Sequence, residues 1–308
     1  MNQAIPLLLI GLITPSTVAQ QTAATLAPST GITPPGLSQA NQQQTISPGS
    51  QNLEPDSKNA RPLKPLDPGL AQVADVPGLP RVLIIGDSIS MGYTPPVRAK
   101  LDGKANIHHP PMNCGDSQRA LDKADRHAQT GPDNLEKWLG KDHWDVILFN
   151  FGLHDLKYTD GKGRYISPED GGIRDTPPSP YAKNLQEIAA RLQKTGAKVV
   201  FVTTTPVPPG CTGRVAGDEK IYNEVALGVM KPLNIQVADL CGFVVEKQRD
   251  LPPRPANEAP KSGEHHAISR PGEIQLPFNV HFTPEGYDQL ADIIVSSIQK
   301  SLPIIPGK

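Results

Sequence analysis

The sequence predicts an α/β fold in which helices cover both faces of one parallel sheet. Short continuous apolar runs are typical of strands buried on both faces, and the segments between them carry apolar residues at helical spacing. The two kinds of segment alternate from Arg81 onward, which favours a parallel sheet. The five expected strands cover residues 81–86, 105–108, 144–150, 198–203 and 235–240.

The helices between these strands are predicted from capping residues and apolar spacing. Thr94-Pro95-Pro96 is typical of the N-cap and first turn of a helix, which would close at Gly103. Apolar residues at helical spacing indicate a longer helix that Gly196 ends. The full set of expected helices covers residues 94–103, 132–140, 179–196, 218–230 and 283–301.

The first 79 residues differ in composition from the rest of the chain. Residues 1–19 combine a short apolar run with the small residues Thr17-Val18-Ala19, as in a cleaved export signal, although no Lys or Arg precedes the run. Residues 20–79 are rich in Gln, Pro, Ser, Thr and Ala, which predicts a disordered linker because so little apolar surface cannot offset the entropy of ordering. We therefore expect an exported protein, periplasmic or extracellular, with a folded domain over residues 80–303.

Charge and hydropathy argue against several classes of function. The chain has 30 basic and 31 acidic residues, a net charge of −1, which argues against a nucleic-acid partner or a polybasic membrane anchor. The apolar run near the start is too short to span a bilayer and no later segment is suited to it, so we expect no stable membrane insertion. We also expect a monomer.

The spacing of cysteines and histidines predicts no metal site. Cys114, Cys211 and Cys241 are an odd number, so the simplest expectation is one disulfide of open pairing and one free thiol. His108 and His109 are adjacent on an expected strand and would point to opposite faces, and no Cys or carboxylate cluster has ligand spacing. We expect neither a metal nor another cofactor.

Two residues in loops beside the sheet form a candidate catalytic pair. Reactive groups of such folds lie at the carboxyl ends of the strands, and the first strand ends in Gly86-Asp87-Ser88. A serine there has an exposed hydroxyl, and the helix that follows stabilises nearby negative charge. His281 precedes the last helix and is suited to act as the base that a serine nucleophile needs.

Four blocks along the chain together resemble the SGNH, or GDSL-type, hydrolase family. They are Gly86-Asp87-Ser88, the glycine of Asn113-Cys114-Gly115, Gly152-Leu153-His154-Asp155, and His281 with Thr283-Pro284-Glu285-Gly286. The third block and the loop Thr203–Pro208 also resemble a bacterial branch of that family.

The resemblance implies a flavodoxin-like three-layer α/β/α fold in a single domain, with ester hydrolysis through an acyl-enzyme on Ser88. It makes His281 the base and assigns the oxyanion to the backbone N–H groups of Ser88 and Gly115 and to a side chain of the third block. Asp87 and Asp155 are expected to hydrogen-bond the loop backbone near the site.

The chain departs from the family pattern at two positions. His154 stands where Asn is usual; its ring N–H could serve as the oxyanion donor, with Asn150 as the substitute. Phe278 stands where the family has an Asp, three residues before His281. We predict a Ser88–His281 dyad that the main chain orients.

The competing partners for His281 are the neutral side chain of Asn279 and the remote carboxylates of Asp155 and Asp239. The Pro-rich, charged segment 250–276 is expected to be a loop insertion, either a solvated loop or a lid over the site.

We expect a secreted serine esterase that acts on a small-molecule or polysaccharide ester, with acetyl groups on carbohydrate as the expected substrate. An O-acyltransferase would use the same Ser88 and His281 but exclude water. A lipase-like enzyme would need a broad apolar cleft, and a degenerate carbohydrate-binding module would need no reactive serine.

Overall fold

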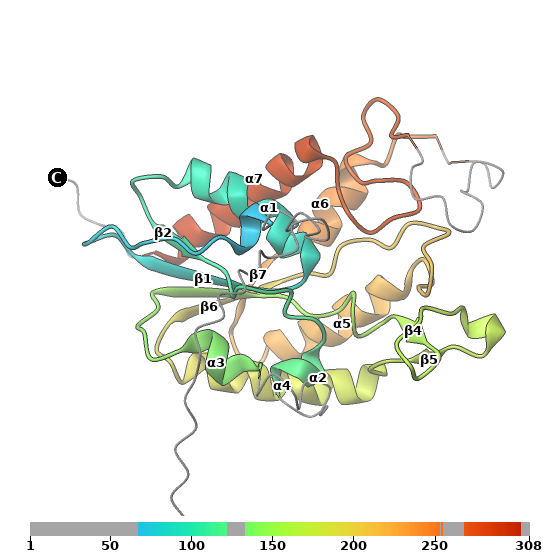
Figure 1. The fold of residues 1–308 in the computed structure, drawn as a ribbon, viewed down its shortest axis with the longest axis horizontal. Coiled ribbons are helices and arrows are strands. Elements are labelled where there is room, and N and C mark those ends of the chain that lie inside the picture. The colour runs from blue at the N-terminus through green and yellow to red at the C-terminus, as the bar shows by residue number, and fades with distance from the viewer. Residues whose placement is uncertain (1–66, 122–132, 253, 255–267, 303–308) are drawn as a thin grey trace, which may run out of the picture. The chain divides into compact units, whose positions relative to one another are not determined.

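The centre of the fold is a parallel sheet of five strands in the order β2-β1-β3-β6-β7 (Figure 1). The structure, a computed structural model, describes residues 67–121, 133–252, 254 and 268–302. The strands are β1 (Arg81–Ile85), β2 (Asn106–His108), β3 (Val146–Phe149), β6 (Lys198–Val202) and β7 (Gln236–Ala238). All five expected strands are present, and their order is that of a flavodoxin-like fold.

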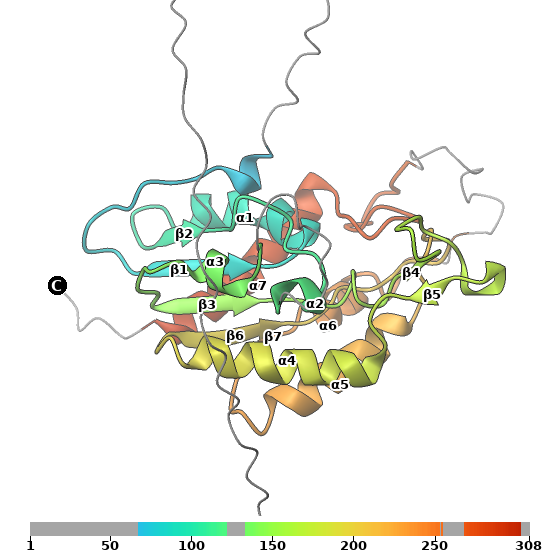
Figure 2. The same cartoon turned by 60° about the horizontal axis from the view of Figure 1, so that its bottom comes forward.

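Helices cover both faces of this sheet, which confirms the three-layer prediction (Figures 1 and 2). One face carries α1 (Ser88–Lys100), α6 (Leu240–Lys247) and α7 (Pro284–Ser301). The other carries α2 (Ser117–Ala120), α3 (Leu135–Leu139), α4 (Pro178–Gln193) and α5 (Asp218–Met230). Two short turns of 3-10 helix, Pro68–Leu70 and Pro168–Asp170, and an antiparallel pair, β4 (Tyr158–Thr159) with β5 (Ile173–Arg174), complete the described elements.

The interior of the sheet is apolar, as the continuous runs predict. All four residues of β3 are fully buried, and so is the stripe of α4 that packs on the sheet, formed by Leu185, Ile188, Ala189 and Leu192. Burial of apolar surface on this scale is the main stabilising term of the fold. The packed interior also holds the carboxyl ends of the strands in place, and the candidate catalytic residues lie at those ends.

Helix α1 begins six residues before the predicted start, because Asp87 rather than Thr94 caps it. The Asp87 carboxylate accepts the backbone N–H of Ile89 at 2.9 Å, which satisfies a donor that the helix leaves free. Pro95 and Pro96 therefore lie inside the helix, and the Thr94 hydroxyl donates to the Ser90 carbonyl at 2.7 Å. Helix α6, capped by Asp239, was not predicted at all.

The folded domain begins earlier than the predicted boundary at residue 80. Asn106 accepts the backbone N–H of Val76 at 2.9 Å and donates to its carbonyl at 3.1 Å, and Arg98 donates to the Pro68 carbonyl at 3.0 Å. Residues 67–79 are thus held by polar contacts with the backbone, which apolar content does not reveal. The predicted export signal, residues 1–19, and the linker up to residue 66 lie outside the described residues.

The two ends of the predicted insertion, residues 250–276, are joined by an ion pair. Arg254 Nε donates to Glu273 at 2.8 Å, and Glu273 also accepts the backbone N–H of Arg270 at 2.7 Å. Residues 255–267, which make up most of the insertion, lie outside the described residues, so the choice between a solvated loop and a lid stays open.

All three cysteines are free thiols, so the expected disulfide is wrong. Cys114 is fully buried where its backbone N–H donates to the Gly86 carbonyl at 3.0 Å, whereas Cys241 lies on α6. They belong to different elements, and nothing pairs them.

Among the described helices, none is both long and apolar enough to cross a membrane.

Candidate active site

Ser88 and His281 are brought together at the carboxyl edge of the sheet, although 193 residues separate them in the chain. Ser88 is the first residue of α1, directly after the turn that follows β1, and His281 lies three residues before Pro284, the first residue of α7. The Ser88 Oγ lies 2.8 Å from His281 Nε2, within hydrogen-bond distance. Helices α1 and α7 pack side by side, which brings the two loops together (Figure 1).

Asn279 fixes which nitrogen of His281 carries the proton. Its side-chain Oδ1 accepts the backbone N–H of His281 at 3.1 Å and lies 2.7 Å from the ring Nδ1. A backbone N–H is always a donor, so the atom that faces it must be the amide oxygen. Nδ1 therefore donates to the same oxygen, and Nε2 is left unprotonated to accept the proton of the Ser88 hydroxyl.

The prediction that the main chain orients His281 is wrong, because the Asn279 side chain does so. The remote carboxylates are engaged elsewhere: Asp155 binds Ser117, and Asp239 accepts from Thr203 Oγ1 at 3.0 Å and caps α6. Phe278, where the family has an acid, adopts a left-handed backbone with φ of 55°. The backbone thus turns at Phe278, just before Asn279. Because of this turn, the side-chain amide of Asn279 faces the His281 ring, and the side chain of Phe278 does not.

His154 lies near His281 as a neutral ring. Burial lowers its pKa most, and together with the charges of Lys157, Arg214, Arg119 and His281, in that order, it brings the pKa to about 3. A neutral imidazole keeps one N–H donor. In the part of the chain that the structure describes, no protein group hydrogen-bonds this ring, so the donor is free for a bound molecule.

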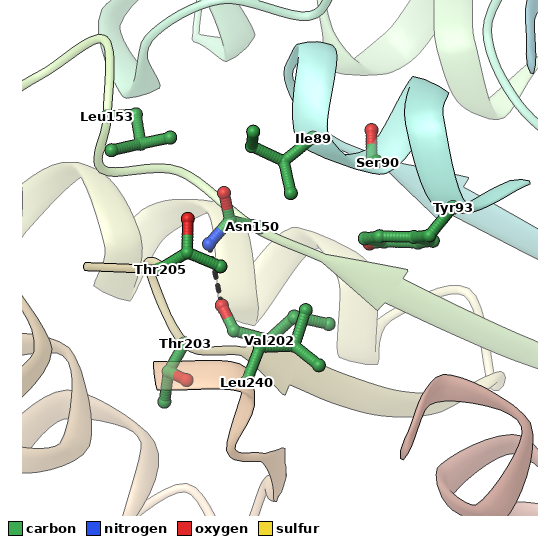
Figure 3. Close-up of a pocket in the computed structure, with 9 residues that line it drawn as sticks. All are labelled: Ile89, Ser90, Tyr93, Asn150, Leu153, Val202, Thr203, Thr205 and Leu240. Carbon is green, nitrogen blue, oxygen red and sulfur yellow. Dashed lines mark hydrogen bonds between the residues drawn. The ribbon is translucent and has the colours of Figure 1, made fainter. Parts of the chain in front are cut away.

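Asn150 is not available as a substitute oxyanion donor. Figure 3 shows its side chain directed to the neighbouring strand, where Nδ2 donates to the Val202 carbonyl at 2.7 Å. The residue is buried and lines a small internal cavity with Ile89, Ser90 and Thr205. Of the two side chains considered for this role, His154 alone is left.

The two backbone donors expected at the site differ in their partners. Ser88 is the first residue of α1, so its N–H has no acceptor within the helix. The Gly115 N–H, by contrast, donates to the side-chain oxygen of Asn113 at 2.9 Å. Gly115 has φ of 71°, a conformation suited to glycine. The Gly115 N–H can bind a substrate oxygen only when its hydrogen bond to Asn113 is broken.

Buried aspartates hold the loops of the site together. Asp155 is fully buried and accepts the Ser117 hydroxyl at 2.5 Å and its backbone N–H at 3.1 Å, which ties the third block to the start of α2. Burial raises its pKa to about 7. Asp87 caps α1 directly beside Ser88, and burial raises its pKa as well. Both therefore have the loop-fixing contacts that the sequence led us to expect.

Sequence reasoning missed Arg214, which lies in the loop between β6 and α5. Its Nε donates to the Leu153 carbonyl at 3.0 Å, beside His154. Burial lowers the pKa of His281, and the charge of Arg214 lowers it further. The position of Arg214 cannot be predicted from the sequence, because only the fold of its Gly-rich loop brings the residue to the site.

Solved structures resemble the fold at low sequence identity. An acetyl xylan esterase, AlAXEase, is 17% identical, with 71% of this chain and 99% of that chain covered and a TM-score of 0.48. A lipase/acylhydrolase from Enterococcus faecalis is 18% identical, with 75% and 100% covered and a TM-score of 0.47. A putative arylesterase from Agrobacterium tumefaciens str. C58 is 16% identical, with 73% and 100% covered and a TM-score of 0.47.

A comparison with curated proteins gave no match. A family model, in contrast, matches residues 84–289, a span that runs from β1 to the start of α7 and holds all four sequence blocks. That span is more than half of the chain, and the description of the family names lipases and acylhydrolases. The chain therefore belongs to the GDSL-like lipase/acylhydrolase family.

Proposed function

We propose that this protein is a serine esterase that hydrolyses small acyl esters through an acyl-enzyme on Ser88. The observation that carries the proposal is the 2.8 Å contact of Ser88 Oγ with His281 Nε2, in a ring whose other nitrogen Asn279 holds as a donor. A serine hydroxyl is a weak nucleophile until an adjacent base accepts its proton, and this arrangement supplies that base.

In the first half of the reaction, Ser88 Oγ attacks the carbonyl carbon of the ester and its proton passes to His281 Nε2. The tetrahedral intermediate then collapses: the bond to the alcohol oxygen breaks, and His281 returns the proton to that oxygen. In the second half, water attacks the acyl group and gives a proton to His281. Collapse frees the carboxylic acid, and Ser88 Oγ regains its proton.

The negative oxygen of the intermediate would be stabilised by the Ser88 N–H and by the ring N–H of His154. The first is a free donor at the start of α1, where the helix dipole also favours negative charge. The second is neutral, so it donates without changing its own charge. Removing one such donor typically lowers kcat by about 10² to 10³.

The proposal includes acetyl esters of carbohydrate as the substrate class, and export of the protein. Its test is the release of p-nitrophenol from p-nitrophenyl acetate and of acetate from an acetylated polysaccharide, each with wild type and Ser88→Ala. We expect wild type to hydrolyse both esters and Ser88→Ala to hydrolyse neither.

The same assay, run with an added sugar acceptor, identifies the competing transferase. Formation of an acetylated sugar at the expense of free acetate would show that the acyl group goes to an alcohol instead of water. A wild-type protein that leaves both esters intact would overturn the proposal and favour a binding module.

A further inference from the structure

Arg214 lies close enough to His281 for its charge to lower the pKa of that ring, and among the described residues only one of its guanidinium nitrogens has a hydrogen-bond partner. Nε donates to the carbonyl of Leu153 at 3.0 Å, and Cζ lies 5.5 Å from the ring centroid of Tyr165, a side chain that is 46% exposed. Among the described residues, nothing pairs with the terminal nitrogens Nη1 and Nη2. Arg214 is half-buried as a residue, so its side chain has lost part of its hydration, and no described carboxylate pairs with it.

The neighbouring cations differ from Arg214 because each has an acidic partner. Lys157 Nζ lies 5.6 Å from the centroid of the same Tyr165 ring and 3.2 Å from Asp175. Arg119 lies 3.0 Å from Asp133. All three cations lower the pKa of His154, and two of them, Lys157 and Arg214, also lie over the same Tyr165 ring. Among the described residues, Arg214 is the member of this group that has no acidic partner.

The charge of Arg214 opposes the reaction in the free enzyme. It lowers the pKa of His281, and so disfavours the imidazolium that forms when Ser88 attacks. Asn279 is neutral and cannot offset this effect. Arg214 also lowers the pKa of Asp87, but the Asp87 carboxylate accepts the N–H of Ile89 and makes no ion pair with the guanidinium. An anion bound beside Arg214 would offset its positive charge, and His281 would then be protonated more readily.

We propose that Arg214 binds a carboxylate that the ester substrate carries close to its scissile bond. The inference rests on the proposed ester hydrolysis at Ser88 and names its substrate class as anionic esters. The free Nη1 and Nη2 match the two oxygens of a carboxylate, a geometry that arginine provides and lysine does not. The bound carboxylate would supply the negative charge that Asn279 lacks, so the substrate itself would stabilise the imidazolium of His281.

The test compares matched esters that differ only in charge. With the carboxylate on the leaving group, the pair is 4-acetoxybenzoate and 4-acetoxybenzamide; with it on the acyl group, the pair is p-nitrophenyl 4-carboxybenzoate and p-nitrophenyl 4-carbamoylbenzoate, in which the carboxylate cannot reach the ester intramolecularly. For one pair we expect wild type to show a kcat/KM about 10- to 100-fold higher with the anion, the range of a charge-assisted hydrogen bond. The pair that shows the preference identifies the side that carries the carboxylate.

Variants assign the preference to Arg214. Arg214→Gln should abolish it, and the neutral ester should then react faster because the opposing charge is gone. Arg214→Lys should keep part of the preference. Lys157→Gln, which removes a paired cation from the same Tyr165 ring, is the matched control and should keep most of it. Equal kcat/KM for both members of each pair in wild type, or a preference that survives Arg214→Gln, would overturn the inference.

A binding measurement separates this inference from the proposed function. In Ser88→Ala, 4-acetoxybenzoate or the 4-carboxybenzoate ester should bind about tenfold more tightly than its neutral partner, and Arg214→Gln added to Ser88→Ala should equalise the affinities. Equal affinities in Ser88→Ala overturn the anionic-substrate inference even if wild type hydrolyses esters. A clear preference in binding supports it even if no ester is hydrolysed, in which case the proposed function alone fails.

Discussion

Asn279 binds His281 twice through a single side-chain oxygen, at 3.1 Å to the backbone N–H and at 2.7 Å to the ring Nδ1. The first contact fixes the orientation of the amide, and the amide then fixes the tautomer of the ring. An asparagine in this position orients the base as an aspartate would, but it adds no negative charge to stabilise the imidazolium. The third residue of a catalytic triad both orients the base and stabilises its positive charge. In this protein Asn279 performs the first function without the second.

Substitution of Asn279 tests these two functions one at a time. Asn279→Ala removes the oxygen that orients the ring, and we expect kcat to fall by about 10² to 10⁴, the usual contribution of a positioned base. Asn279→Asp keeps an acceptor and adds a charge that favours the imidazolium, so it should keep most of kcat. A melting curve for each variant controls for misfolding.

The pH profile of the same variants gives a sharper measurement. Burial and Arg214 lower the pKa of His281, so the acid limb of kcat/KM in wild type should lie below the ordinary range of histidine. The carboxylate of Asn279→Asp raises that pKa, and the limb should move to higher pH by about one unit or more. An unchanged limb would mean that His281 is not the group that titrates.

His154 is expected to act in the transition state and not in substrate binding. His154→Ala should lower kcat by about 10² to 10³ with little change in KM, because the oxyanion forms only as the reaction proceeds. His154→Asn, which restores an N–H donor, should recover part of the loss. If both variants match wild type, the donor is another group, and Gly115 after release by Asn113 is the next to test.

Asp155 should make the stability of the fold depend on pH. Its pKa is raised to about 7 in the folded protein, above about 3.9 in the unfolded chain, so the folded state binds the proton more tightly. This contribution is complete below about pH 4 and is lost as the pH rises through about 7, on the order of 4 kcal/mol at most. Denaturant unfolding at several pH values measures it.

The control for that measurement is Asp155→Asn, which cannot titrate. Its free energy of unfolding should be lower overall, since the hydrogen bonds to Ser117 are weakened, but it should lack the decrease between about pH 4 and about pH 7. Its kcat should fall far less than the roughly 10⁴-fold typical of losing a triad acid. The same decrease in wild type and variant would show that Asp155 is already ionised at low pH.

Residues 67–75 should contribute measurably to stability. A chain that begins at Val76 lacks the contact of Pro68 with Arg98 and the ion pair of Asp75 with Arg81, and we expect it to melt about 5 °C below a chain that begins at Asp67. Differential scanning calorimetry of the two chains makes the comparison. Equal melting temperatures would restore the boundary at residue 80.

The sequence was sufficient for the fold and for the residues that meet at its carboxyl edge. Apolar runs mark β1, β3 and β6, whereas β2 and β7 are short and of mixed composition; Ser88 and His281 follow from their places beside capped helices. The partner of His281 was not predictable in the same way, because several acceptors lay within reach along the chain and only the backbone turn at Phe278 selects Asn279. Arg214 was missed because its position depends on the fold of a loop without periodicity.

The most direct test of the account is to identify the residue that a serine-reactive phosphonate labels. Peptide mapping by mass spectrometry should place a single adduct on Ser88, and Ser88→Ala should remain unlabelled. Ser90 is the matched control, because its hydroxyl also lies near a histidine, 2.7 Å from His109 Nε2, but is 2% exposed. Ser90→Ala should therefore still be labelled on Ser88. An adduct on Ser90 or Cys114, or labelling that persists in Ser88→Ala, would contradict the account.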